Sequence, residues 1–227
     1  MPGPPWDDDD PADRATIAAN IDKLVRSMRA GAGVRTVPGV AVVQRWHADI
    51  YDGCHLPAAG YAGHFRGDPA VAELVGYEVG VGPRQADGYP DRVGLPAAAV
   101  RTAVLRLLAD LGRAVATLDA HVPTGQRPAD PAALQSIAAL AATVHGEWVR
   151  IHPFANGIGR TARLWAAWIA LRYNLPIFVT VKPRPADIDY ATAAHRSMGR
   201  PPDYRAEHGT AAAVFARMLA NAIASNP

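Results

Sequence analysis

The chain has 227 residues, of which 49% are hydrophobic and 19% are charged. A chain of this length and composition can bury the core of one domain, which excludes global disorder. With a formal net charge of only +2, the chain is not strongly basic, as nucleic-acid-binding proteins usually are. A single cysteine, Cys54, cannot form an internal disulfide, and charged residues interrupt every apolar stretch before it reaches membrane-spanning length. We therefore expect a cytoplasmic protein with no nucleic-acid partner and no membrane partner.

The first residues differ in composition from the rest of the chain. Residues 1–11 combine prolines with four consecutive aspartates, Asp7 to Asp10. We predict that they form a mobile N-terminal tail, followed by a single domain over residues 12–227. The aspartates stand where a signal peptide would need a cationic and then an apolar segment. Alternatively, they cap a helix that begins near Pro11, where negative charge favours the helix dipole.

Apolar residues recur at helical spacing through most of the remaining sequence. The predicted helices cover residues 12–30, 39–52, 97–121, 131–149, 157–173, 185–198 and 207–224. The helix at 157–173 is apolar on most sides, so we expect it to be central and buried.

One short segment shows the alternation of a strand instead. Between residues 77 and 81, apolar side chains alternate with Glu78 and Gly80, which predicts a strand within residues 74–81. The run of glycines and prolines over residues 82–90 predicts a loop or a hairpin tip. Together these elements predict an all-α bundle with a small β-hairpin.

The stretch from Ile151 to Arg163, IHPFANGIGRTAR, carries residue types suited to phosphate chemistry. A glycine-rich turn that opens a helix directs backbone N–H groups to one point and favours an anion there. Arg160 and Arg163 are three residues apart on one helical face, and their planar guanidinium groups match phosphate oxygens. His152 precedes them and has the usual pKa of a general base near neutral pH. The stretch predicts a site for a phosphorylated ligand.

This stretch resembles the signature of Fic-domain proteins, which reads His-Pro-Phe-x-(Asp/Glu)-Gly-Asn-Gly-Arg-x-x-Arg. The chain matches the signature at His152, Pro153, Phe154, Gly157, Gly159, Arg160 and Arg163. The sequence around Trp46-His47, 63–67 and 76–81 is also similar to the part of that domain that leads into its flap. The resemblance therefore spans residues 38–200, approximately, and implies a Fic-type helical bundle with a hairpin flap.

The resemblance also implies an activity, the transfer of AMP from ATP to a hydroxyl of a target protein (AMPylation). It makes His152 the catalytic base that takes the proton from the target hydroxyl. It makes Arg160 a ligand of the nucleotide phosphates and Arg163 a ligand of the outermost phosphate. The full set of implied phosphate-binding residues is Asn156, Gly157, Ile158, Gly159, Arg160 and Arg163. The flap residues Tyr77, Val79 and Gly80 would align an extended target segment by main-chain pairing.

Two departures from the signature bear on activity. Asn156 stands where the family has an acid that would hold Mg²⁺, so we expect any Mg²⁺ to be weakly held and predict no metal ligand. Ile158 replaces an asparagine and removes a phosphate donor, which typically lowers a rate by ~10²–10³-fold. Two other interpretations of Ile158 stay open. It packs into the core while backbone N–H groups bind phosphate, or it was introduced to trap a complex.

Several alternatives to a fully active transferase remain. A degenerate or repurposed Fic fold would bind a nucleotide or a phosphorylated small molecule without AMP transfer, and the toxin half of a toxin–antitoxin pair is a further option. Many Fic proteins are restrained by a Ser/Thr-x-x-x-Glu-Gly/Asn helix. No Glu here precedes Gly or Asn, and the nearest spacing, Thr143 to Glu147, is followed by Trp148. A separate inhibitory partner could then restrain the activity.

The other polar clusters favour less specific interpretations. His47, His55 and His64 lack the spacing of zinc ligands. The basic residues Lys182, Arg184, Arg196 and Arg200 predict a solvated surface, or alternatively a rim for phosphates or acidic groups.

Overall fold

The computed structural model describes residues 4, 6, 10–86 and 88–226. The mobile tail expected over residues 1–11 therefore lies mostly outside the described residues. Of the tail residues that are described, Trp6 is buried and packs against the rings of His47, Tyr51 and Tyr61.

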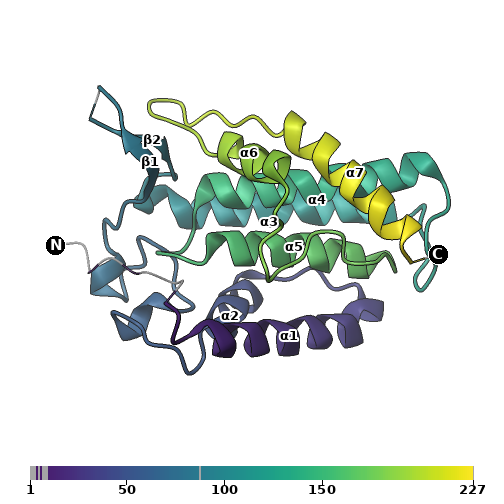
Figure 1. Cartoon of the computed structure of the whole chain (residues 1–227), viewed down its shortest axis with the longest axis horizontal. Coiled ribbons are helices and arrows are strands. Elements are labelled where there is room, and N and C mark those ends of the chain that lie inside the picture. The colour runs from purple at the N-terminus through teal and green to yellow at the C-terminus, as the bar shows by residue number, and fades with distance from the viewer. Residues whose placement is uncertain (1–3, 5, 7–9, 87, 227) are drawn as a thin grey trace.

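Helices make up most of the described chain, which confirms the predicted all-α class. They are α1 (Arg14–Gly31), α2 (Val40–Ile50), α3 (Ala97–Asp119), α4 (Pro131–Ile151), α5 (Ile158–Arg172), α6 (Ile188–Ser197) and α7 (Gly209–Ala224). In Figure 1, α4 and α5 run through the middle, with α1 and α2 on one side and α6 and α7 on the other. Among the described residues, no helix is both long and apolar enough to cross a membrane.

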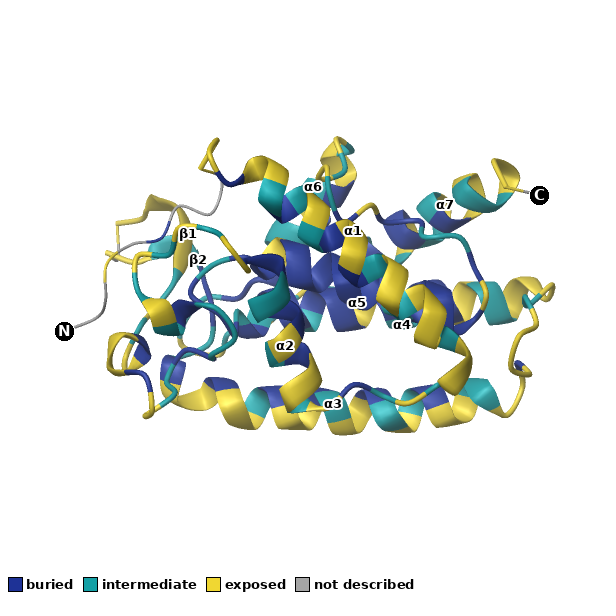
Figure 2. Ribbon diagram, turned by 90° about the horizontal axis from the view of Figure 1, so that it is seen from below, coloured by how far each residue is buried: buried dark blue, intermediate teal, exposed yellow. Residues whose placement is uncertain are grey.

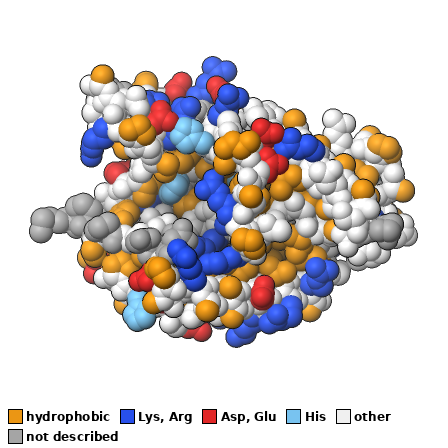
Figure 3. Space-filling view, viewed as in Figure 1, with side chains coloured by type: hydrophobic (Ala, Val, Ile, Leu, Met, Phe, Trp, Pro, Cys, Tyr) orange, Lys and Arg blue, Asp and Glu red, His pale blue; other side chains and the backbone are white. Residues whose placement is uncertain are grey.

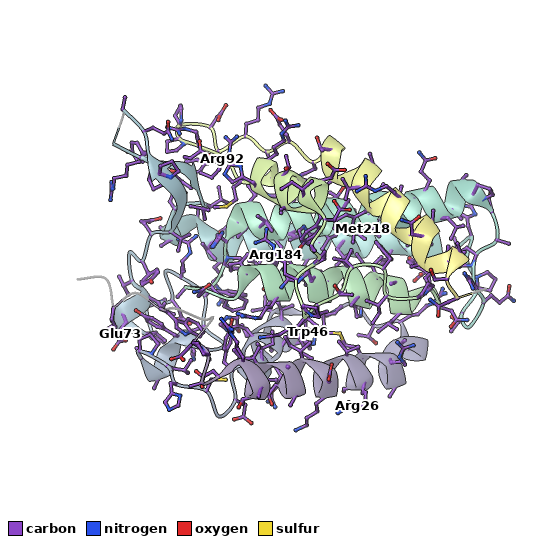
Figure 4. All side chains as sticks on the ribbon, in the orientation of Figure 1. Arg26, Trp46, Glu73, Arg92, Arg184 and Met218 are labelled. Atoms are coloured by element: carbon purple, nitrogen blue, oxygen red, sulfur yellow. The ribbon has the colours of Figure 1, made fainter. Side chains whose placement is uncertain are left out.

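The core forms where α5 packs against α4. Helix α5 is buried along almost its whole length, as its apolar composition predicts, and Figure 2 shows the buried residues concentrated on these two helices. The rings of Trp148 and Trp165 are fully buried and meet edge to face at 5.7 Å. Trp46, labelled in Figure 4, reaches Trp165 from α2 at 5.0 Å. The Trp148 indole N–H donates to Thr161 Oγ1 at 2.8 Å, so the one polar atom of that ring is satisfied.

The hairpin lies further along the chain than the sequence predicts. Strand β1 (Gly80–Arg84) pairs antiparallel with β2 (Pro90–Val93), so the prediction of a strand over 74–81 is correct only at its last two residues. Residues 82–84, predicted as part of a loop or a hairpin tip, belong to β1.

The displacement has a physical cause, because the residues just before β1 are engaged elsewhere. The carbonyl of Tyr77 accepts a hydrogen bond from Arg66, and the Glu78 carboxylate accepts one from the backbone N–H of Ala97. Those contacts hold Tyr77 against Arg66 and Glu78 against the start of α3, and pairing starts only at Gly80.

The far side of the hairpin is attached to the end of α6. The backbone N–H of Val93 donates to the carbonyl of Gly199 at 3.0 Å. The carboxylate of Asp91 lies 3.0 Å from His195 Nε2, and Arg200 donates to the Asp91 carbonyl at 3.1 Å. The hairpin is thus positioned by α6 as well as by its own strand pairing.

We expect Thr161→Val to destabilise the fold by about 1–3 kcal/mol, because it leaves the buried Trp148 N–H without an acceptor. The matched control is Thr117→Val, which removes only an exposed hydroxyl bonded within its own helix and should change stability by less than about 0.5 kcal/mol. Urea unfolding measures both values, and equal stabilities of the two variants would contradict the assigned hydrogen bond.

Candidate functional site

The loop between α4 and α5 carries the phosphate signature and is rigidly held. His152 follows the last residue of α4 in the left-handed conformation, with φ of +53°, and its N–H donates to the carbonyl of Trp148 at 3.0 Å. The Pro153 carbonyl accepts from the backbone N–H of Arg66 at 2.8 Å. Phe154 is fully buried and stacks on the ring of His47 at 3.8 Å, so the proline and phenylalanine anchor the loop.

The half-buried His152 ring is held in one tautomer. Its Nδ1 lies 3.3 Å from the carbonyl of Val149, which can only accept, so Nδ1 carries the proton and Nε2 keeps its lone pair. The pKa of His152 is lowered to about 3, mainly by burial and also by the nearby positive charge of Arg66. The hydrogen bond to Val149 raises the pKa, but by less than these two effects lower it. The imidazole is therefore neutral at physiological pH, which is the state that a general base requires.

Arg66 is the main structural residue that the sequence does not reveal. Its guanidinium is buried and donates to the carbonyls of Tyr77, Leu95, Ile151 and His152, at 2.6 to 3.1 Å. It also lies 3.5 Å from the carboxylate of Glu78. Arg66 belongs to the stretch 63–67 that resembles Fic proteins. Its carbonyl partners lie in other segments of the chain, and only the fold brings those segments to its side chain.

His47 holds the other side of the loop. Its Nδ1 accepts from the backbone N–H of Gly63 at 2.9 Å, so Nε2 carries the proton and donates to the carbonyl of Asn156 at 3.0 Å. Burial lowers the pKa of His47 to about 3, so these bonds persist through neutral pH. Both ring nitrogens bond to the backbone, which assigns His47 a structural role.

Gly157 begins the turn into α5 and has no room for a side chain. Its φ is +75°, and a Cβ atom there would lie 2.3 Å from the hydroxyl of Tyr51. The same hydroxyl accepts from Arg160 Nη1 at 2.9 Å. The N–H groups of Ile158 and Gly159 lie in the first turn of α5, where the helix itself supplies no carbonyl partner. They are available to an anion at the start of the helix.

A cavity of about 410 Å³ opens at this turn, and all six predicted phosphate-binding residues line it. Its lining consists of Arg14, Asn156, Gly157, Ile158, Gly159, Arg160, Arg163, Lys182, Pro183 and Arg184. Figure 3 shows Lys and Arg side chains gathered in the middle of this face. Of the four basic residues predicted to form a solvated surface or a rim for phosphates or acidic groups, Lys182 and Arg184 line this cavity, whereas Arg196 and Arg200 do not.

His152 lines a second cavity, of about 200 Å³. It shares with the first cavity the four residues Ile158, Gly159, Arg163 and Arg184. The rest of its lining is mostly apolar and comes from α4, α6 and the flap.

Only Val81 of the flap reaches this second cavity. The three flap residues named from the sequence, Tyr77, Val79 and Gly80, line neither cavity. Of these three, only Gly80 lies in β1.

The two departures from the Fic signature have clear structural positions. Asn156 Oδ1 accepts from the N–H of Gly157 at 2.8 Å, and its Nδ2 donates to the carbonyl of Trp6 at 2.6 Å. An acid could not make the second bond because an ionised carboxylate has no donor. Ile158 is 4% exposed, so its side chain packs in the core next to the phosphate turn.

Glu147, at the spacing closest to an inhibitory motif, is engaged away from the phosphate turn. Its carboxylate accepts from Arg150 at 2.7 Å and lies 2.6 Å from His208 Nε2.

Within the helical bundle, the arginine-lined turn at the start of α5 lies next to a cavity that the neutral His152 lines. A model of the Fic/DOC family matches residues 96–170, which include α3, α4, the loop after α4 and most of α5. This match, together with the fold, confirms the resemblance of the chain to the Fic/DOC family.

Solved Fic-domain structures share the fold. A Fic domain containing signaling protein from Bacteroides thetaiotaomicron VPI-5482 aligns with a TM-score of 0.56 and 17% identity, over 91% of this chain and 70% of that one. BepC, a VirB-translocated effector from Bartonella tribocorum solved with bound AMPPNP, aligns with a TM-score of 0.51 and 14% identity, over 90% and 86% of the two chains. No curated protein sequence matches the chain.

Arg66→Lys should lower the free energy of unfolding by about 2–4 kcal/mol, because an ammonium cannot reach all of the carbonyls that the guanidinium fork satisfies. Arg113→Lys is the matched control, since Arg113 is exposed and bonds only to the neighbouring Asp110 on α3. Chemical unfolding of both variants tests the assignment, and a loss of less than about 1 kcal/mol for Arg66→Lys would contradict it.

The lowered pKa of His152 gives a spectroscopic prediction. Between about pH 8 and about pH 5, its ring proton signals should not shift, because the imidazole titrates only near pH 3. His55 provides the internal control, since it is exposed and its hydrogen bond to Asp13 raises its pKa, so its ring signals should shift in the same titration. An NMR titration, with the His152 signal assigned by its loss in His152→Ala, measures both. A midpoint near 6.5 for His152 would contradict the deduced burial of its ring.

Proposed function

We propose that this chain is a Fic-type nucleotidyltransferase that moves AMP from ATP to a hydroxyl of a target protein. The observation that carries the proposal is the neutral His152, with Nε2 unprotonated, on a cavity that adjoins the arginine-lined phosphate turn. His152 Nε2 accepts the proton of the target hydroxyl as its oxygen attacks the α-phosphorus of ATP. The bond from that phosphorus to the oxygen bridging the α- and β-phosphates breaks, and pyrophosphate leaves.

The anion site supplies the charge stabilisation for this step. The first-turn N–H groups of α5 face the developing negative charge on the α-phosphate, in the manner of an oxyanion hole. Arg160 and Arg163 line the cavity on the same side and would hold the departing phosphates. Both side chains are less than one-tenth exposed, so their attraction to a phosphate is only weakly screened by solvent.

The flap offers an edge for the target. All residues of β1 are exposed, and the sheet has only the strands β1 and β2 within the described residues. An extended target segment can pair with the free edge of β1 by main-chain hydrogen bonds. We place that pairing at Gly80 to Arg84, with Tyr77 and Val79 supporting the base of the flap.

The departures at Asn156 and Ile158 favour a second candidate function, the binding of a phosphorylated ligand without transfer. The buried Ile158 side chain brings no donor to the phosphate turn, which would slow a transferase by ~10²–10³-fold. Binding requires fewer preorganised donors than stabilisation of a transition state, so it would survive this loss.

Intact-mass analysis of lysate proteins after incubation with ATP and Mg²⁺ separates these functions. We expect a nucleotidyl adduct with the chain and none with His152→Ala, because the alanine variant cannot accept the hydroxyl proton. The Ile158→Asn variant should raise the yield, by up to ~10²–10³-fold, because it restores a donor at the turn. An adduct that persists with His152→Ala would contradict the role of the histidine. No adduct with any of the three proteins would contradict transfer and favour binding alone.

A further inference from the structure

The phosphate cavity contains more positive charge than the Fic signature accounts for. Besides Arg160 and Arg163, it is lined by Arg14 at the start of α1 and by Lys182 and Arg184 from the connection between α5 and α6. None of the described residues that line it is an acid. Five cationic side chains from three separate segments therefore surround one cavity of about 410 Å³.

The segment that carries Lys182 and Arg184 is held by Arg163 of the signature. Arg163 donates from Nε to the carbonyl of Val181 at 2.8 Å, next to Lys182. Its Nη1 atom lies 3.0 Å from where a Cβ of Gly159 would be, so the glycine leaves room for the guanidinium against the turn. Arg163 thus binds the 181–184 segment with one nitrogen and lines the cavity with the rest of its fork. Arg184, labelled in Figure 4, belongs to the connection that leads to α6.

The residues present do not suit a protein-held Mg²⁺ ion. Magnesium prefers carboxylate oxygens beside phosphate oxygens. At the position where the Fic signature has an acid, this chain has Asn156. Its amide oxygen accepts from the N–H of Gly157, and its amide nitrogen donates to the carbonyl of Trp6. The described residues contain no cluster of three or more His, Cys, Asp or Glu side chains that could hold a metal.

We propose that this cavity binds the polyphosphate part of its ligand without a divalent cation, with Lys182 and Arg184 supplying the positive charge that a metal would bring. The inference deepens the proposed function, because it specifies how the same site holds its donor. A terminal phosphate group carries a charge of about −1.5 to −2. Several guanidinium and ammonium groups can neutralise a polyphosphate by binding its oxygens directly. Arginine is suited to this role because it remains charged and binds phosphate oxygens bidentately.

The test is isothermal titration of the full chain with inorganic tripolyphosphate, once with EDTA and once with excess Mg²⁺. We expect binding in EDTA that is as tight as in Mg²⁺ or tighter, because Mg²⁺ reduces the negative charge of the probe. Binding that requires Mg²⁺, or no binding in either condition, would overturn the proposal.

Charge variants locate the site. Arg184→Gln should weaken binding in EDTA by about tenfold or more, as expected for the loss of a charged hydrogen bond. Arg184 is exposed, so this variant should retain its fold, which its unfolding transition checks. Arg196→Gln is the matched control, because Arg196 belongs to the same basic stretch of sequence but lines a different cavity. Equal weakening by both substitutions would mean that the probe senses only the overall charge, and would overturn the assigned site.

The outcomes for binding and for transfer are separate. Metal-free binding lost in Arg184→Gln, without any nucleotidyl adduct, would uphold this inference while the proposed transferase activity fails. A His152-dependent adduct formed only with Mg²⁺, without metal-free binding of the probe, would uphold the transferase and overturn this inference.

Discussion

The geometry of the site depends on one buried guanidinium, that of Arg66. An isolated charge in the core would be strongly unfavourable, and Arg66 is tolerated because four carbonyls and the Glu78 carboxylate surround it. Two of those carbonyls belong to residues 151 and 152, one to the base of the flap and one to the segment before α3. The same group that fixes the position of His152 therefore fixes the flap relative to it. Its charge also helps to keep the histidine neutral.

On the opposite side of the loop, His47 and the aromatic cluster restrict the choice of residues at the signature positions. His47 binds the Asn156 carbonyl, and the Asn156 amide reaches the Trp6 carbonyl, so the N-terminal segment and the loop are connected by hydrogen bonds. An acid at position 156 would serve a metal but would face a carbonyl oxygen at 2.6 Å without a donor. Asparagine satisfies that carbonyl and gives up the metal ligand. The departure from the family signature thus has a structural reason in this chain.

Local sequence was sufficient for the helices and for the phosphate turn. The period of apolar residues locates each helix, and the spacing of Gly157, Arg160 and Arg163 is itself a local property of a helix start. The strand was misplaced because its starting residue depends on contacts of Tyr77 and Glu78 with distant segments. The roles of Arg66 and His47 could not be predicted for the same reason, since their partners are far away in the sequence.

The arrangement of the two cavities constrains the reaction more than either cavity does alone. All five cationic side chains line one cavity and the base, His152, lines the other, and the two cavities share Ile158, Gly159, Arg163 and Arg184. In the proposed reaction, a phosphorylated ligand would span both cavities, with its reacting phosphorus at the shared wall beside the first-turn N–H groups of α5. Its charged end would lie among the arginines, and its other end would lie in the mostly apolar cavity between α6 and the flap. Ile158, at that wall, is the residue best placed to set how closely the phosphate approaches the backbone.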